Sequence, residues 1–335
     1  MSETGSAVPP GPAIPAGTAG HLPAPPLPLS GLMLARGSVD RATHRRGDEE
    51  WLAAAWADPA TRVLVVHDGQ ALITETGDGA ELALLPSAEA PDGLRMLLGV
   101  DAGGAAYFAV MAGLPDTPSA DLPPGAPPPV RPATLREAAP LLSDRDAGLM
   151  THAVALANWH AVFVHCPRCG TVTRPEQAGY SRRCPNDGSE HFPKVDPAMI
   201  VLVTDSADRA LLARNAQWPA RRVSILAGFV EAGESGEQAV MREVREETGL
   251  SVGAIRYLGS QPWPMPQSLM LGFRAEAEDG QQITVDTVEI AEAAWYSREE
   301  LRAALGSGQI RLPPPVSIAH RIIQSWYGAE LPGSW

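Results

Sequence analysis

The stretch GFVEAGESGEQAVMREVREETGL, residues 228–250, decides the fold class of this chain. It fits the pattern G-x5-E-x7-R-E-(aliphatic)-x-E-E-x-G-(aliphatic) at every fixed position. The fixed positions are Gly228, Glu234, Arg242, Glu243, Val244, Glu246, Glu247, Gly249 and Leu250. Chance does not supply so many matches in order, so the stretch predicts a defined structural and chemical unit.

The second half of the stretch predicts a helix that carries a cluster of carboxylates. Residues 235–248 contain no proline and a single early glycine, and Gly249 is a good helix stop. Glu243, Glu246 and Glu247 stand at i, i+3 and i+4, so their side chains share one helix face. Like charges at this spacing repel by about 0.2–0.5 kcal/mol per pair in an isolated helix. The cluster is instead a set of hard oxygen ligands, which Mg²⁺ uses beside substrate phosphates.

Three further residues favour a metal site over a solvated acidic surface. Gly228 and Gly233 allow the preceding loop to fold tightly against the start of the helix. Arg242 lies next to the carboxylates, where it can orient or partly neutralise them. A solvated helix face would explain the acidic residues, but it would not explain the glycines and the arginine at fixed offsets.

Composition limits the class of protein. The length of 335 residues predicts two or three domains, and the net charge of −13 gives no general attraction to nucleic acid or anionic membranes. We find no apolar run of membrane-spanning length and no secretory signal pattern. Three cysteines, two of them in a CxxC pair, suit a reducing compartment and a metal site. The sequence therefore predicts a soluble, cytoplasmic protein.

Short apolar runs separated by DG and PDG turns predict a sheet-rich region after the proline-rich first 28 residues. Its expected strands are 62–66, 71–74, 82–85 and 106–110, and a helical pattern follows over 135–164. Further on we expect a hairpin of 200–205 with 210–215, strands over 268–278 and 291–297, and a helix over 298–305. The proline-rich segment 115–132 predicts a linker.

Three cysteines and one acidic residue predict a structural zinc site. Cys166-Pro-Arg-Cys169-Gly is a zinc knuckle, because CxxC followed by glycine lets two thiolates converge on one tetrahedral ion. Cys184-Pro-Asn-Asp187 stands at the right distance to supply the other two ligands, with aspartate in the fourth position. His191 is the alternative fourth ligand, and a ribbon that packs without metal is the alternative to a zinc site.

A proline-rich loop, SQPWPMPQS, follows the acidic helix at 260–268. Its alternating prolines forbid a helix and favour extended backbone. We expect this backbone to display Gln261, Trp263 and Ser268 as fixed contacts for a ligand. A loop of this composition also occurs as a simple spacer.

The combination of zinc ribbon, acidic-helix motif and SQPWPxPxS loop resembles the NADH pyrophosphatases, the NudC-type Nudix hydrolases. The resemblance runs from about Trp159 to the C-terminus and includes LPPPVSIAHRII at 312–323. The chain departs from the family pattern at Met265, where the family has phenylalanine, and at Asp187, where it has a fourth cysteine.

The resemblance implies roles for particular residues. Catalysis would depend on Arg242, Glu243, Glu246 and Glu247, with Glu247 activating water. The glutamates, with Glu276 as an additional ligand, would bind Mg²⁺ or Mn²⁺. The substrate would be bound by Phe192, Phe229, Gln261, Trp263 and Ser268. Family members are homodimers, so a homodimer is implied as well.

The expected fold is a mixed α+β and α/β architecture in five segments. They are a disordered tail (1–28), a sheet-rich N-terminal domain with its linker (29–133), connecting helices (134–165), a zinc ribbon (166–192) and a Nudix α/β/α sandwich with a mixed sheet (193–335).

The expected reaction is metal-dependent hydrolysis of the diphosphate bond of NADH or NAD⁺ to AMP and nicotinamide mononucleotide. Removal of NAD caps from RNA 5′ ends would be the same cleavage on a larger substrate. The alternatives are a Nudix hydrolase of ADP-ribose or a diadenosine polyphosphate, and an inactive module that senses a nucleotide.

Several other residues have both a structural and a functional interpretation. We expect core positions for Trp218, Trp295 and Trp326, and a buried, hydrogen-bonded position for His160. Arg221 and Arg222 precede a strand and fit two interpretations equally, a phosphate contact or an exposed strand edge.

Overall fold

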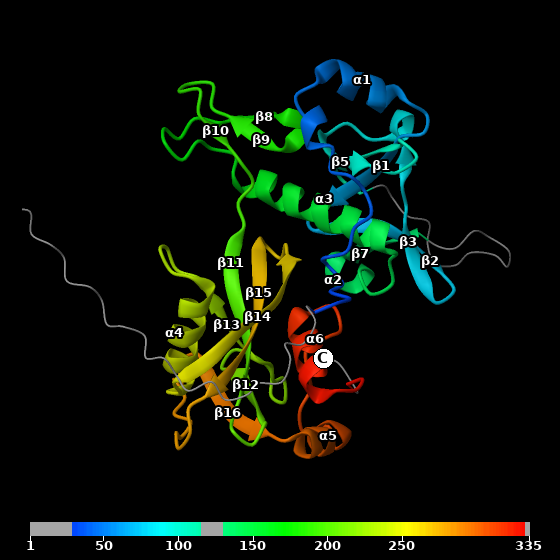
Figure 1. Cartoon of the computed structure of the whole chain (residues 1–335). Helices are drawn as coiled ribbons and strands as arrows, with labels where there is room; N and C mark the ends of the chain where they lie inside the picture. Colours follow the sequence, from blue (N-terminus) through cyan, green and yellow to red (C-terminus); the bar gives the residue numbers. More distant parts are fainter. Residues whose placement is uncertain (1–28, 115–129, 332–335) are drawn as a thin grey trace, which may run out of the picture.

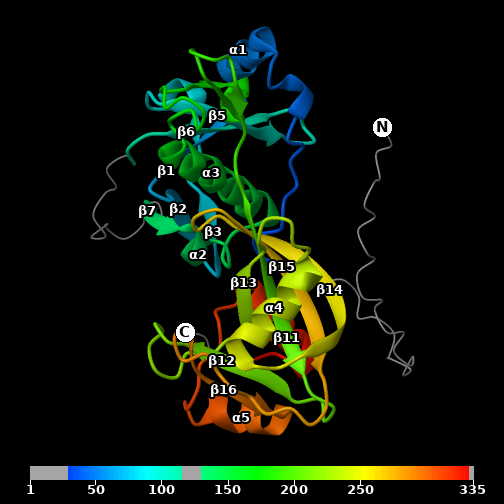
Figure 2. The same ribbon diagram turned by 90° about the vertical axis from the view of Figure 1, so that its left-hand side faces the viewer.

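The computed structural model describes residues 29–114 and 130–331. The expected tail over 1–28 and most of the expected linker lie outside the described residues. Figures 1 and 2 show two α/β bodies stacked end to end, with a small ribbon beside the first. None of the helices in the described part of the chain has the length and apolar character that a membrane span requires.

The first body is a mixed sheet covered by helices on both faces. Strands β3-β2-β1-β6-β5 follow one another in the sheet, while β4 and β7 pair with β1 and β2. The strands are β1 (Arg62–His67), β2 (Gln70–Thr76), β3 (Gly79–Leu82), β4 (Leu85–Pro86), β5 (Leu94–Val100), β6 (Ala106–Met111) and β7 (Val130–Thr134). Helix α1 (Glu49–Ala57) packs on one face, and α2 (Leu135–Ala138) and α3 (Asp144–Val162) pack on the other. The helices expected as a connection thus cover this sheet.

Two expected elements in this body are wrong in detail. The helical pattern over 135–164 is two helices, because Pro140 cannot continue α2 and Ser143 starts α3 by accepting a hydrogen bond from the Asp146 N–H. The single strand expected over 82–85 is divided between β3 and β4. The chain bends at Ala83 and Leu84 because it changes partner there, from β2 to β1.

The ribbon is a three-stranded antiparallel sheet in the order β10-β9-β8. Its strands are β8 (Arg174–Glu176), β9 (Ser181–Arg183) and β10 (Glu190–His191). The cysteines lie in the turns at its end. The ribbon attaches to α3 through Arg182, which donates to the Thr173 carbonyl and contacts His160 Nδ1 at 3.0 Å.

The second body confirms the expected α/β/α sandwich with a mixed sheet. Strands β14-β15-β11-β12-β16 follow one another, β13 pairs with β11, and β11 and β15 are parallel. The strands are β11 (Asp196–Thr204), β12 (Ala210–Asn215), β13 (Leu226–Phe229), β14 (Val252–Trp263), β15 (Ser268–Ala277) and β16 (Ile290–Tyr296). Helix α4 (Gly236–Thr248) covers one face, and α5 (Arg298–Gly306) and α6 (Ile318–Tyr327) cover the other, as Figure 1 shows.

Helix α4 begins and ends where the sequence predicts. Ser235 accepts from the Gln238 N–H, and the Gln238 side chain accepts from the Ser235 N–H, which completes a capping box. Gly249 ends the helix at φ 71°, a conformation that glycine adopts without strain. One side of α4 packs into the sheet through Ala239, Val240 and Val244, so the glutamates face the end of the sheet.

The two bodies are joined by polar contacts as well as by chain connections. The Gln261 amide oxygen accepts from the Leu34 N–H at 3.3 Å, and its NH₂ donates to the Val316 carbonyl at 3.0 Å. Leu34 and Val316 belong to the core of the first body. Asn158 of α3 donates to the Pro264 carbonyl at 2.8 Å, which fixes the tip of the β14–β15 hairpin against the first body.

Candidate active site

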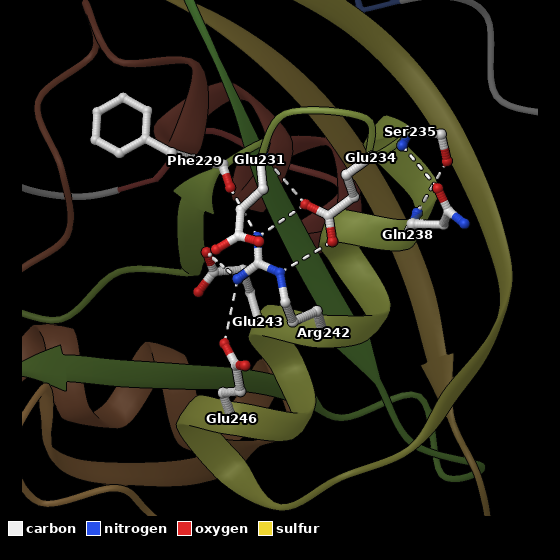
Figure 3. A network of polar contacts seen from close by, with 8 residues as sticks. All are labelled: Phe229, Glu231, Glu234, Ser235, Gln238, Arg242, Glu243 and Glu246. Carbon is white, nitrogen blue, oxygen red and sulfur yellow. Dashed lines mark hydrogen bonds and ion pairs between the residues drawn. The ribbon is translucent and has the colours of Figure 1, made fainter.

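Arg242 is the centre of a polar network at the start of α4 (Figure 3). Its guanidinium donates to both carboxylate oxygens of Glu234 at 2.9 Å, and to the Phe229 carbonyl at 2.8 Å. It also contacts Glu243 at 2.9 Å and Glu246 at 3.1 Å. Arg242 therefore fixes the loop 229–234 against the helix and positions two of the predicted metal ligands.

Gly228 is required by a close approach of this helix. A Cβ atom at this position would lie 2.0 Å from the carboxyl carbon of Glu243. The Glu243 side chain, which is 12% exposed, thus lies directly over the backbone of β13. Any larger residue would displace this carboxylate, which gives the first glycine of the motif a physical reason.

Glu247 is the most deeply buried carboxylate of the site. The residue is 6% exposed, and its Oε2 is buried with no hydrogen-bond partner among the described residues. Burial, and next the charges of Glu243, Glu289 and Glu246, raise the pKa of this carboxyl to about 8. Burial also raises the pKa of Glu243. Buried, mutually repelling carboxylates with an unpaired oxygen fit a divalent cation.

Glu289 is a member of this acidic cluster that the sequence did not reveal. It lies in the segment before β16, and its charge contributes to the raised pKa of both Glu243 and Glu247. The segment is held against the end of α4 because the Asp286 N–H donates to the Glu247 carbonyl at 3.1 Å. No helical or strand spacing connects Glu289 with the motif, so only the tertiary fold identifies it.

The prediction that Glu276 joins the metal ligands is wrong in this structure. Alternate residues of β15, including Phe273 and Ala275, face α4, so Glu276 points to the opposite face of the sheet. It pairs in register with Thr204 at the end of β11, whereas Gly228 pairs with Met199 near its start. The five-residue difference along β11 places Glu276 about 16 Å from the end of the sheet at which Gly228 lies.

A cavity of about 320 Å³ lies on the face of the sheet that α6 covers, and it reaches Ala227, the neighbour of Gly228 in β13. Its lining is mostly apolar, with one cation, Arg136, contributed by the first body. Its walls include Ile200, Trp218, Ala227, Trp263, Met270 and Ala319. A largely apolar cavity with few polar groups is typical of a small-molecule site.

The loop SQPWPMPQS forms the tip of the β14–β15 hairpin, in which Trp263 pairs with Ser268. Trp263 lines the cavity, and the Arg136 guanidinium lies 5.2 Å from the centre of its ring. Met265, which replaces the family's phenylalanine, packs against the core of the first body. The expectation that Gln261 is displayed is wrong: it is fully buried, because its amide joins Leu34 to Val316.

The remaining aromatic residues are placed as follows. Phe192 and Phe229 are exposed, at 53% and 60%, and available for contacts outside the chain. Trp326 is buried as expected, and Trp295 is half-buried against the core beneath α4. Trp218 was expected in the core, but it is half-buried and lines the cavity, since the loop after β12 carries it over the edge of the sheet.

His160 is the buried, hydrogen-bonded histidine that we expected. Its Nε2 lies 2.8 Å from the Gly179 carbonyl, and Arg182 contacts its other ring nitrogen. Burial lowers the pKa of His160 to about 4. The side chain is therefore neutral and connects α3 with the ribbon.

The ribbon brings together Cys166, Cys169, Cys184 and Asp187, whose ligand atoms all lie within 4.8 Å of one another. The Cys169 and Cys184 sulfurs are 3.5 Å apart, and the Cys166 sulfur is 3.8 Å from Asp187 Oδ2. Three thiols and a carboxylate in this arrangement fit a tetrahedral zinc ion. The alternative ligand, His191, lies outside the group and contacts Ser189 Oγ at 3.0 Å.

Comparison with protein families covers most of the chain. Residues 194–314 match the NUDIX domain, and residues 163–192 match the NADH pyrophosphatase zinc ribbon domain. Residues 60–159 match the NADH pyrophosphatase-like rudimentary NUDIX domain. The last match agrees with the observation that the first body is itself an α/β sandwich.

Individual relatives extend the comparison. The NAD-capped RNA hydrolase NudC of Mycobacterium bovis (strain BCG / Pasteur 1173P2) is 44% identical over 313 residues, covering 89% of this chain and 95% of that protein. The NAD-capped RNA hydrolase NUDT12 of Homo sapiens is 39% identical over 197 residues, covering 55% of this chain and 42% of that protein. A NUDIX hydrolase structure from Nitrosomonas europaea matches 41% of this chain and 78% of that chain at 23% identity and a TM-score of 0.36.

Proposed function

Because this chain belongs to the NudC-type Nudix hydrolases, the NADH pyrophosphatase family, we propose that it hydrolyses the diphosphate bond of NADH or NAD⁺. The products are AMP and nicotinamide mononucleotide. The proposed substrates include NAD at the 5′ end of RNA, since the same bond is broken and the relatives from Mycobacterium bovis and Homo sapiens are named for it.

The observation that carries the proposal is the buried, unpaired carboxylate oxygen of Glu247 among the charges of Glu243, Glu246 and Glu289. A protein that only senses a nucleotide has no use for four repelling carboxylates, which lower stability unless a cation is bound. The neighbouring cavity offers Trp263 and Arg136 to the rest of a dinucleotide. In this proposal the dinucleotide extends from the carboxylates past strand β13 into the cavity.

In the proposed mechanism Glu243, Glu246, Glu247 and Glu289 would hold Mg²⁺ or Mn²⁺. The bound cation supplies neutralisation of phosphate charge and a lower pKa for water. Glu247 takes the proton as water attacks phosphorus, and its Oε2 has no other hydrogen-bond partner among the described residues. Arg242 acts as a positioning residue, since it holds Glu243 and Glu246 in place.

Other parts of the molecule have supporting roles in this proposal. Trp263 and Ser268 contact the dinucleotide, and Gln261 holds the loop rather than the substrate. The ribbon holds a structural zinc ion through Cys166, Cys169, Cys184 and Asp187. Two chains form a homodimer in which the exposed Phe192 and Phe229 flank a base of the substrate. The protein acts in the cytoplasm, where its three cysteines stay reduced.

The test is turnover of a substrate panel with Mg²⁺ or Mn²⁺, followed by chromatography. The panel contains NADH, NAD⁺, ADP-ribose and a diadenosine polyphosphate, in separate reactions. We expect AMP and reduced nicotinamide mononucleotide, formed fastest from NADH. Equal or faster cleavage of ADP-ribose or the diadenosine compound would leave a Nudix hydrolase but contradict the assigned substrate.

A further inference from the structure

Acidic residues are unevenly distributed along this chain. Asp and Glu account for 39 of its 335 residues, yet none occurs over 209–230 or over 301–329. The first of these segments contains four arginines and the second contains three. In a chain with a net charge of −13, two long segments that carry only positive charge are an exception to the general composition.

The fold places these two segments side by side at the cavity. The Arg311 N–H donates to the Arg221 carbonyl at 2.7 Å, and the Val223 N–H donates to the Arg311 carbonyl at 3.0 Å. An isolated β-bridge joins Arg222 to Arg311. Arg221, Arg222 and Arg311, here called the arginine rim, therefore form one group. Both segments also line the cavity, the first through residues 218 and 224 and the second through residues 313 and 314.

The arginine rim faces solvent. Arg221 and Arg311 are exposed and Arg222 is half-buried. Arg221 has a φ of +73°, a conformation that costs a bulky residue about 1–3 kcal/mol. The surrounding backbone hydrogen bonds hold it there. The loop thus keeps a strained backbone at a position that presents a cation beside the cavity.

The rim is too far from the acidic cluster to contact the same phosphates. Six residues of nearly extended chain separate Arg222 from Gly228, which corresponds to about 20 Å. The diphosphate that is cleaved lies at the carboxylates in the proposed function. A ligand of the rim must therefore carry further negative charge on the other side of the cavity.

Trp218 adds an aromatic surface between the rim and the cavity. It is half-buried, and its backbone carbonyl accepts from Arg214 at 3.4 Å. Aromatic side chains within a positively charged surface are the usual means by which proteins bind single-stranded nucleic acid, through base stacking and phosphate contacts. The positive charge and the tryptophan here occur in one loop.

We propose that the arginine rim binds the RNA chain that follows an NAD cap, an inference that rests on the proposed function. Every nucleotide after the cap adds a phosphate that free NADH lacks. The rim supplies cations to these phosphates at the mouth of the cavity, while the cap occupies the cavity itself. It therefore raises the efficiency of the enzyme on capped RNA and has no effect on free dinucleotides.

The test compares Arg221→Gln/Arg311→Gln with the wild type on two substrates, NADH and a short NAD-capped single-stranded RNA. A matched control is Arg41→Gln/Arg95→Gln, which removes the same charge from exposed positions in the first body. We expect kcat/KM for NADH to be unchanged in both variants. For capped RNA, only the rim variant should lose efficiency, and most strongly at low salt.

The salt dependence gives the size of the effect. Each phosphate contact with single-stranded nucleic acid contributes a slope of about −0.7 in log affinity against log salt. Loss of two contacts therefore makes the fall in RNA affinity between 50 and 200 mM salt ~7-fold smaller. Equal slopes for the rim variant and the control would overturn the proposal.

Two further outcomes separate this proposal from the function on which it rests. Cleavage of NADH but not of capped RNA by the wild type would overturn the rim's role and leave NADH hydrolysis intact. Absence of turnover on both substrates would remove the proposed function, and the inference about RNA with it.

Discussion

Replacing Glu247 by glutamine should stabilise the metal-free protein at neutral pH while it removes most of the turnover. The carboxyl is almost completely buried, and one oxygen has no partner in the described part of the chain. Glutamine has nearly the same shape but carries no charge. The substitution therefore removes the cost of a buried charge without creating a cavity.

The expected magnitude follows from the pKa of Glu247, which rises from an ordinary value of 4.5 to about 8. The folded protein holds this proton more tightly than the unfolded chain does, so the ionisation penalty is absent below pH 4.5. The penalty grows as the pH rises from 4.5 and levels off above pH 8. At pH 7 it amounts to about 3 kcal/mol, at ~1.4 kcal/mol per pH unit.

The assay is urea unfolding of both proteins in metal-free buffer at pH 5 and pH 7. The free energy of unfolding of the variant should exceed that of the wild type by about 3 kcal/mol at pH 7 and by less than about 1 kcal/mol at pH 5. Addition of Mg²⁺ should raise the stability of the wild type far more than that of the variant, because ligand binding to the folded state is stabilising. Loss of turnover should accompany these changes.

A matched control is Glu246→Gln, because the Glu246 side chain is 60% exposed. Its removal should change the unfolding free energy only slightly at either pH. If Glu247→Gln were less stable than the wild type at pH 7 without metal, the carboxylate would be stabilised by partners rather than strained by burial. The assignment of Glu247 as the base and metal ligand would then lose its physical support.

Three further predictions concern other parts of the protein. Glu289→Gln should weaken Mg²⁺ activation roughly tenfold or more, whereas Glu276→Gln should leave it unchanged, as titration of the rate against Mg²⁺ would show. Asp187→Cys should bind zinc more tightly than the wild type and Asp187→Ala more weakly, measured by competition with a chelating dye; equal retention by all three would exclude Asp187 as a ligand. Asn158→Ala should raise the KM for NADH about fivefold through loss of the hydrogen bond to Pro264, with little change in kcat and in the melting temperature.

Local sequence patterns predicted those elements whose causes are local. The helix over 235–248, with its serine cap and glycine stop, depends on hydrogen bonds between neighbours in the chain. The hairpin of β11 and β12 depends on a short turn between two apolar strands. The cysteine spacing likewise brought three thiols and Asp187 together, because ribbon turns are short.

The incorrect predictions concern residues whose environment depends on distant segments. Glu276 and Glu289 are both acidic residues in or beside strands. Glu276 lies on the face of β15 that points away from α4, whereas the backbone hydrogen bond from Asp286 to Glu247 holds the segment of Glu289 against α4. Gln261 was expected to face a ligand, but the segment that buries it begins more than two hundred residues earlier, at Leu34. The sequence does not indicate a role for Arg136, because nothing near it in the chain suggests a cavity formed with the second body.

The contribution of the first body to this cavity separates the chemistry of the site from its selectivity. The acidic cluster lies entirely in the second body, which needs no help to hold a cation near a diphosphate. Arg136, however, comes from α2, and Asn158 of α3 holds the loop that carries Trp263. Changes in the first body should therefore alter substrate affinity without touching the carboxylates, and changes at the carboxylates should alter turnover on every substrate alike. The rudimentary sandwich, which lacks the acidic helix, thus contributes Arg136 to the cavity and Asn158 to the support of the loop that carries Trp263.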